Sequence, residues 1–185
     1  SSSEEALKIS ETSCLRMAEL IQSFKRVSVE QMSFDIEPLN LIELKRRLKE
    51  SAAQYSVPIS INITNSTANE FHTFSEGIYW ILNELLKNSC EHAKSENGVF
   101  VEFELNNQSL RIHFYDQGVG VKGENIDLIF DPFFTTGRGV DRKLGLGLYQ
   151  TKNIIVQLLH GTVEVNNING LNFEIIIPLL LAEST

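Results

Sequence analysis

A carboxylate, an amide and an imidazole follow one another at four-residue intervals in the segment NELLKNSCEHA, residues 83 to 93. They belong to Glu84, Asn88 and His92, and the apolar residues between them have the spacing of an amphipathic helix. Residues four apart lie on one face of a helix. That polar face is therefore either a solvated surface or a surface that contacts a ligand, and the spacing alone leaves both interpretations open.

A second polar motif, YDQGVGV at residues 115 to 121, ends an expected strand. A carboxylate at a strand end, here Asp116, can accept hydrogen bonds from an exocyclic amine. The neighbouring Gly118 and Gly120 would let the backbone approach a flat ring closely. Asp-x-Gly is also common in ordinary turns, so this motif by itself does not decide between a ligand site and a turn.

Features of phosphate binding follow further along the chain. Glycines combine with Arg138, Arg142 and Lys143 in a stretch that fits a mobile flap with cations available to phosphates, although an ordinary surface loop has the same composition. Gly145 and Gly147 stand at the start of an expected helix, where exposed amides and the positive end of the helix dipole bind phosphate well.

Aromatic residues precede this stretch. Phe130, Phe133 and Phe134 surround Pro132. An exposed aromatic cluster would be costly, so we expect these side chains to anchor the loop to the core.

The rest of the chain supplies the elements that must position these residues. Apolar periodicity predicts helices over residues 41–54, 74–93, 125–130 and 146–160. It predicts strands over 57–64, 98–105, 110–116, 162–167 and 171–179, with hairpin turns at 106–109 and 168–170. This order indicates an α+β fold, a two-layer sandwich of a mixed, mostly antiparallel sheet with helices on one face. Asn40 is placed to cap the helix that begins at residue 41.

Residues 4 to 33 have the pattern of one long N-terminal helix. Leu7, Cys14 and Ile21 recur every seven residues, with Met17 and Phe24 at the alternate position of the stripe. Such a helix could pack on its own domain, but we favour a helix of a dimeric bundle. The predicted organisation is therefore a helical segment, 1–33, followed by one domain over residues 34–185.

Composition narrows the class of protein. The 185 residues are 42% hydrophobic, enough to bury a core, and the net charge of −8 disfavours nonspecific binding to nucleic acid or an anionic membrane. No stretch of about 18 apolar residues predicts a membrane span. Two cysteines are too few for a disulfide scaffold, which predicts a cytoplasmic location, including the cytoplasmic part of a membrane-bound sensor.

Taken together, four motifs in order resemble the ATP-binding domain of sensor histidine kinases: an Asn-bearing helix, Asp-x-Gly-x-Gly, Phe-Pro aromatics and Gly-Leu-Gly-Leu. The superfamily also contains the gyrase, Hsp90 and MutL ATPases, and the resemblance covers about residues 35 to 180. It implies a Bergerat-type fold that binds ATP and Mg²⁺ and transfers the γ-phosphoryl to a histidine on a partner helix. It further implies a phosphoacceptor histidine domain, a response regulator receiver domain and a homodimer of the full-length kinase, with no nucleic-acid partner.

The resemblance also implies roles for individual residues. Asn88 matches the family's Mg²⁺ ligand, and Asn83 matches a second asparagine that supports the same site. Asp116 matches the aspartate that binds the adenine amino group. The remaining predicted cofactor-binding positions are Gly118, Gly120, Phe133, Thr135, Thr136, Arg138, Gly145, Leu146, Gly147 and Leu148. His92 and Lys143 are predicted with them, although they stand where the family has other residues, because each could contact phosphate.

Glu84 leaves the type of enzyme open. One turn from the metal ligand, it could act as a general base, or it could make a structural hydrogen bond. As a base toward water it would make the chain an ATP hydrolase of the same superfamily. Glu91 and Lys143 depart from the family pattern, so a non-catalytic interaction module that retains the fold is a further alternative.

The phosphoacceptor is expected outside this chain. In the family the acceptor histidine is followed by an acidic residue and, a little later, by a proline. That context is absent at all four histidines, His72, His92, His113 and His160.

Overall fold

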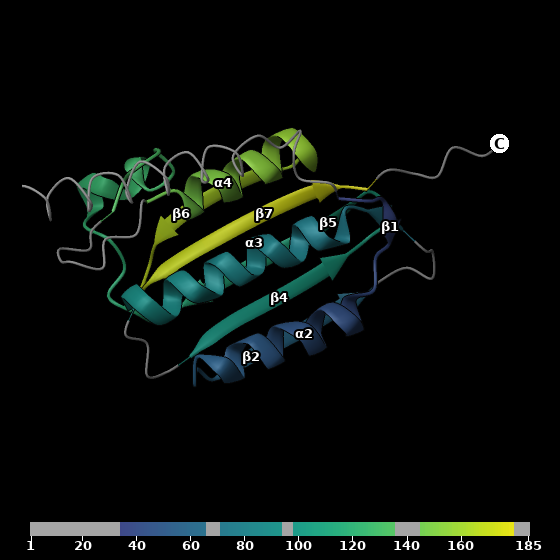
Figure 1. Cartoon of the computed structure of the whole chain (residues 1–185), viewed down its shortest axis with the longest axis horizontal. Helices are drawn as coiled ribbons and strands as arrows, with labels where there is room; N and C mark the ends of the chain where they lie inside the picture. Colours follow the sequence, from purple (N-terminus) through teal and green to yellow (C-terminus); the bar gives the residue numbers. More distant parts are fainter. Residues whose placement is uncertain (1–33, 66–70, 94–97, 136–144, 180–185) are drawn as a thin grey trace, which may run out of the picture. The chain divides into compact units, whose positions relative to one another are not determined.

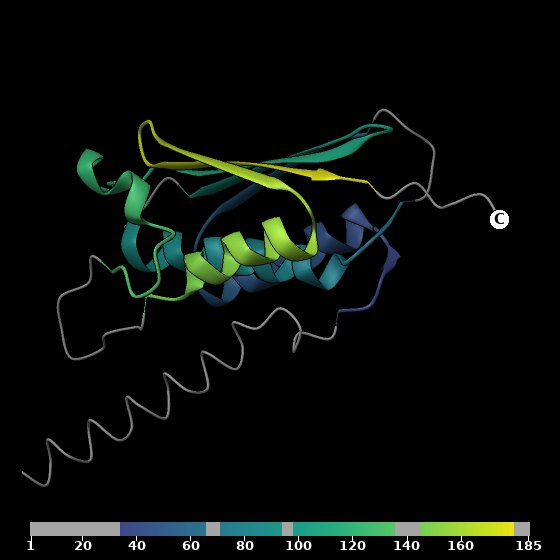
Figure 2. The same cartoon turned by 90° about the horizontal axis from the view of Figure 1, so that it is seen from above.

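The computed structural model describes residues 34–65, 71–93, 98–135 and 145–179. In this part of the chain a five-stranded sheet carries helices α2, α3 and α4 on one face (Figures 1 and 2). The long helix predicted for residues 4–33 lies outside the described residues.

The helices are α2 (Leu41–Gln54), α3 (Ser75–Asn88) with the π-helical turn η2 (Ser89–Ala93), the 3-10 helix η3 (Gly123–Leu128), and α4 (Gly147–Asn153) with the π-helical turn η4 (Ile154–Leu158). The strands are β1 (Glu37–Pro38), β2 (Ile59–Asn65), β3 (His72–Thr73), β4 (Val99–Leu105), β5 (Ser109–Asp116), β6 (Thr162–Asn167) and β7 (Leu171–Pro178). The predicted cap is confirmed, because Asn40 Oδ1 accepts a hydrogen bond of 2.9 Å from the backbone N of Glu43.

The sheet has the order β2-β4-β5-β7-β6. β2 pairs with β4 in parallel and every other neighbouring pair is antiparallel, which confirms the mixed, mostly antiparallel sheet. β1 and β3 form a separate two-stranded pair that the periodicity did not predict, because two residues carry no alternation.

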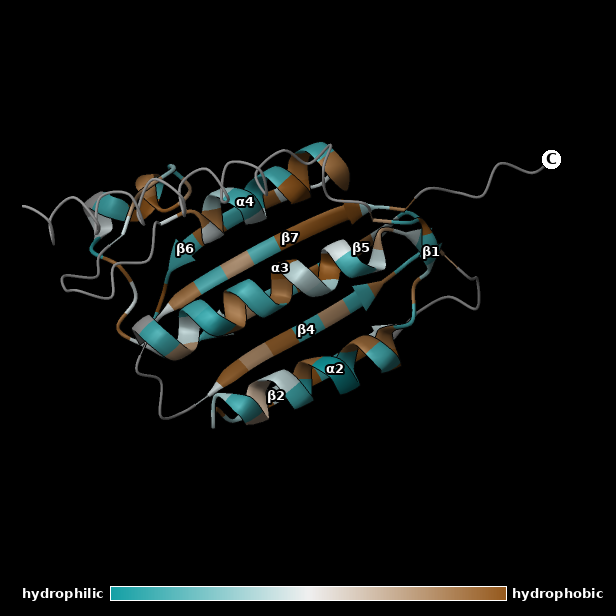
Figure 3. Ribbon diagram, viewed as in Figure 1, coloured by the Kyte–Doolittle hydropathy of each residue, from teal (hydrophilic) through white to brown (hydrophobic). Residues whose placement is uncertain are grey.

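The core lies between the sheet and the helices, where alternate strand residues point. On β4 and β5 every second residue is buried, and α3 contributes an apolar stripe at helical spacing (Figure 3). Phe114 and Phe173 face each other across β5 and β7, with ring centroids 6.3 Å apart in an edge-on arrangement. The fully buried side chains with the largest volumes include Leu48, Ile78, Ile81, Leu82, Phe103, Leu110, Ile112 and Ile154.

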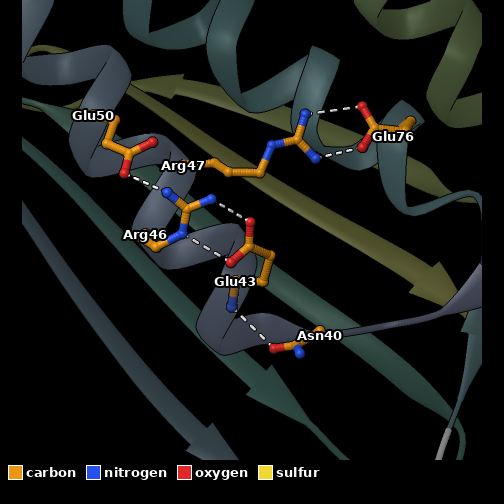
Figure 4. A network of polar contacts seen from close by, with 6 residues as sticks. All are labelled: Asn40, Glu43, Arg46, Arg47, Glu50 and Glu76. Carbon is orange, nitrogen blue, oxygen red and sulfur yellow. Dashed lines mark hydrogen bonds and ion pairs between the residues drawn. The ribbon is translucent and has the colours of Figure 1, made fainter.

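A polar link joins α2 to α3 on the surface. The two terminal guanidinium nitrogens of Arg47 donate to the two carboxylate oxygens of Glu76 (Figure 4). The guanidinium carbon lies 3.8 Å from the centroid of the Tyr79 ring. Arg46, by contrast, binds Glu43 and Glu50 within α2 (Figure 4). Only the Arg47 contacts therefore connect the two helices in this network.

Arg47→Ala is expected to lower the free energy of unfolding by about 1 kcal/mol, because a partly exposed bidentate pair and a cation–π contact are both lost. Arg46→Ala, the matched control, removes only contacts within one helix and is expected to change stability less.

The contribution of the Arg47–Glu76 pair should depend on pH, because the hydrogen bond from Arg47 lowers the pKa of Glu76. The pair stabilises the fold above the ordinary Glu pKa, and this stabilisation is lost as pH falls through the lowered pKa of Glu76 in the folded state. Urea denaturation should show the wild-type advantage over Arg47→Ala at pH 7, and this advantage should shrink as pH falls below the ordinary Glu pKa. An advantage that does not change with pH would contradict this prediction.

Candidate functional site

The predicted polar face of α3 meets the start of α4. A methyl group placed on Gly147 would come within 2.7 Å of Glu84 Oε2 and 3.9 Å of Asn88 Nδ2. The Asn-bearing helix and the Gly-Leu-Gly-Leu motif, which are distant in the sequence, therefore lie side by side. A residue larger than glycine at position 147 would require the Glu84 carboxylate to shift.

The second carboxylate oxygen of Glu84 is held by a lysine. Glu84 Oε1 lies 3.1 Å from Lys87 Nζ, and both side chains are largely covered. Burial opposes the charged ammonium, but the Glu84 carboxylate and the neighbouring Glu91 outweigh it and raise the pKa of Lys87. Lys87 thus stays cationic and fixes one oxygen of Glu84, which leaves the other directed at Gly147.

The side-chain nitrogen of Asn88 is buried and has no hydrogen-bond partner among the described residues. An unpaired buried polar group is costly. A side-chain amide can present either its nitrogen or its oxygen by turning about χ2, and its oxygen suits a hard cation. In the described part of the chain no cluster of three or more His, Cys, Asp or Glu side chains could hold a metal ion.

Asp116 lies buried at the end of β5 and is held from three directions. Its Oδ2 accepts a hydrogen bond of 2.9 Å from the Ser89 hydroxyl, and its Oδ1 accepts from the backbone N of Gly118 at 2.9 Å and of Leu171 at 3.3 Å. Because Ser89 directly follows Asn88, this contact ties the end of α3 to the end of β5. The sequence analysis missed Ser89, and nothing in its local pattern indicates a contact with a residue 27 positions away.

The aromatic segment is only partly anchored in the core. Phe130 is buried edge-on against Phe173, with ring centroids 6.3 Å apart, but Phe133 is 47% exposed. The expectation that Phe133 anchors the loop is therefore wrong. Phe133 has a positive φ of 69° and its backbone N donates to the Gly145 carbonyl at 3.0 Å, so the chain turns back toward the glycine motif and directs the ring outward.

The remaining predicted positions fall into three groups. Asn83 lies apart from the other site residues of α3. Five helical residues separate it from Asn88, which turns its side chain by about 140° away from that of Asn88. Its Oδ1 instead accepts a hydrogen bond from the Ser51 hydroxyl of α2. Leu146 is buried and Leu148 half-buried beside Gly147, while Thr135 is exposed. Outside the described residues and side chains lie His92, Thr136, Arg138 and Lys143.

Within the described residues, no helix is both long enough and apolar enough to cross a membrane. The fold defines the class: a two-layer α+β domain whose candidate site lies on one helix face, one strand end and a helix that begins at a glycine. The family model described as Histidine kinase-, DNA gyrase B-, and HSP90-like ATPase matches residues 74–181. The match covers more than half of the chain, so the chain belongs to this family, whose domains use ATP.

Curated relatives are sensor kinases. The chain is 24% identical over 155 residues to Sensor histidine kinase YxdK of Bacillus subtilis, covering 78% of this chain and 46% of the relative. It is 35% identical over 107 residues to Sensor protein RprX of Bacteroides fragilis, covering 54% of this chain and 20% of the relative. The chain thus spans less than half the length of these relatives.

Solved structures agree on the fold. The catalytic domain of histidine kinase ThkA superposes with a TM-score of 0.61 at 24% identity, covering 78% of this chain and 97% of that one. ThkA in complex with the response regulator protein TrrA gives a TM-score of 0.62 at 23% identity, covering 89% of this chain and 48% of that one. The predicted resemblance to the ATP-binding domain of sensor histidine kinases is confirmed.

Ser89→Ala is expected to weaken ATP binding about tenfold, because Asp116 loses the hydroxyl donor that fixes its Oδ2. Ser89→Thr, which keeps a hydroxyl, is expected to restore most of the affinity. Titration calorimetry with ATP would measure both variants. Equal affinities of wild type and Ser89→Ala would show that the hydroxyl does not orient the carboxylate.

Proposed function

We propose that the chain is the ATP-binding catalytic region of a two-component sensor histidine kinase. It binds Mg²⁺-ATP and transfers the γ-phosphoryl to a histidine on a helix outside this chain, and an aspartate of a response regulator receiver domain receives the phosphoryl next. The full-length kinase would be a homodimer, with this region in the cytoplasm. One observation carries the proposal: Ser89 joins Asp116 to the helix on which Asn88 and Glu84 face Gly147.

Each residue has a chemical task in this proposal. Asp116 accepts the exocyclic amine of adenine, since its carboxylate is an acceptor only and is already oriented by three donors. Asn88 provides an oxygen to the cation, and the backbone from Gly145 to Gly147 receives the phosphates. Glu84 orients the accepting imidazole beside the γ-phosphoryl.

Asn88 would help to hold a Mg²⁺ ion, which would supply positive charge to neutralise the charge that develops on the phosphates. The buried side-chain nitrogen of Asn88 without a partner fits such a site, because a turned amide would supply a neutral oxygen where phosphates supply the charge. Catalysis by the chain itself is then chiefly positioning: it fixes the adenine through Asp116 and the triphosphate through Gly147, at a distance set by the fold.

The test combines this chain, γ-labelled ATP and Mg²⁺ with the phosphoacceptor hairpin of the full-length kinase, supplied as a separate polypeptide. Label is expected on the hairpin histidine, and Asn88→Ala is expected to abolish it. Asn83→Ala is the matched control: that asparagine contacts Ser51 of α2, so labelling should persist.

Other outcomes favour the other functions. Steady release of labelled phosphate without transfer to the hairpin would favour an ATP hydrolase in which Glu84 activates water. Failure of the wild-type chain to bind ATP in the presence of Mg²⁺ would favour an interaction module. Labelling that persists in Asn88→Ala would overturn the assigned site.

A further inference from the structure

The side chain of Asn167, the last residue of β6, contacts the glycine loop that follows Asp116. Its Nδ2 donates a hydrogen bond to the backbone carbonyl of Val121, and its Oδ1 fills the space where a side chain on Gly120 would stand. Gly120 has a φ of +62°, a conformation that glycine adopts without strain. The two segments are 46 residues apart in sequence, so this contact is a tertiary one.

Asn167 adjoins the β6–β7 turn, which is itself held by hydrogen bonds. Asn172 Nδ2 donates to the carbonyl of Ile168 at 2.9 Å and to that of Gly170 at 3.4 Å, which closes the β6–β7 turn. The same turn meets Asp116, because the backbone N of Leu171 donates to the Asp116 carboxylate. One hairpin end therefore contacts both the carboxylate and the glycine loop beside it.

We propose that Asn167 is a positioning residue for base recognition. It holds the backbone of residues 118–121 at a fixed distance from Asp116, and so sets the gap into which a flat base fits while its amine binds the carboxylate. Asn167 does not touch the nucleotide and acts only through Gly120 and Val121. The inference rests on the proposed function, in which Asp116 binds adenine.

A positioning role for Asn167 and a general structural role predict different effects on ligands with and without a base. In the proposed function the phosphates bind at Asn88 and Gly147, on α3 and α4, whereas the side chain of Asn167 contacts Gly120 and Val121 in the loop after β5. Loss of Asn167 should therefore weaken ligands that contain a base and spare ligands that consist of phosphates alone. A defect in the whole fold would weaken both.

The experiment measures the affinity of the whole chain for ADP and for inorganic triphosphate, each with Mg²⁺, by titration calorimetry. Asn167→Ala removes both contacts. Asn167→Asp keeps an oxygen beside Gly120 but places a second acceptor against the Val121 carbonyl. Both variants are expected to bind ADP about fivefold more weakly, the effect of one lost hydrogen bond, and to bind triphosphate within about twofold of wild type.

Asn166→Ala is the matched control, because Asn166 is exposed on the other face of β6, opposite Asn172, and its ADP affinity should not change. Equal ADP affinity of wild type and the Asn167 variants would overturn the inference, as would an equal loss for ADP and triphosphate or the unfolding of both variants. Failure of the wild-type chain to bind ADP would instead overturn the proposed function.

Discussion

Asp116→Asn is expected to weaken ATP binding about 100-fold, the cost of losing a charged acceptor and facing one amino group with another. The carboxylate is buried and accepts from Ser89, Gly118 and Leu171. An asparagine of the same shape keeps Oδ1 as acceptor for the two backbone donors, so the fold should survive. Its amide nitrogen would then point where the adenine amine must donate.

The same substitution should change base preference. An amide nitrogen in the place of Oδ2 can donate to the carbonyl of guanine. ATP affinity should therefore fall more than GTP affinity, so that the ratio of the two affinities also falls. Asp127→Asn on the exposed side of η3 is the control and should bind ATP as wild type does. An Asp116→Asn variant with unchanged affinity and base preference would show that the base lies elsewhere.

Gly170→Ala is expected to destabilise the domain by about 3 kcal/mol or more, because two costs add. A methyl group at this position would overlap the backbone carbonyl oxygen of Asp116 and lie 2.6 Å from its Oδ1. Gly170 also has a φ of +117°, which residues with a side chain rarely adopt. Neither β5 nor the hairpin end can move without disturbing the hydrogen bond from Leu171.

Gly123→Ala provides the control for this prediction. A methyl group on Gly123 would have no heavy atom within 4 Å, so stability should change little. Guanidinium denaturation of the two variants beside wild type would measure the difference. A Gly170→Ala variant as stable as Gly123→Ala would mean that the β6–β7 turn is not held against Asp116 in solution.

Local patterns predicted most of the fold. The α2 boundaries follow from helical periodicity and the Asn40 cap, and β4 and β5 follow from strict alternation of buried and exposed residues. Periodicity also predicted a helix to residue 93, but the last turn, Ser89–Ala93, is π-helical. Hydrophobic spacing does not distinguish an α-helical turn from a π-helical one. The tertiary contact of Ser89 with Asp116 likewise has no local signature.

The candidate site was predictable where one element determines it. Four-residue spacing placed Glu84 and Asn88 on one face, and a strand end placed Asp116. Asn83 was predicted to support the site from the family resemblance, but helical rotation directs it to Ser51. Ser89 and Asn167 act across long sequence separations, which no window along the chain can detect.

The parallel pairing of β2 with β4 has a kinetic consequence. Parallel neighbours need a crossover connection, which here contains α3, so this edge of the sheet joins segments that are far apart in the sequence. Contacts of high sequence separation form slowly, and the groups proposed to bind ATP belong to three elements, α3, β5 and α4. Nucleotide is therefore expected to leave the refolding rate unchanged and to slow unfolding, because it can recognise only the completed domain.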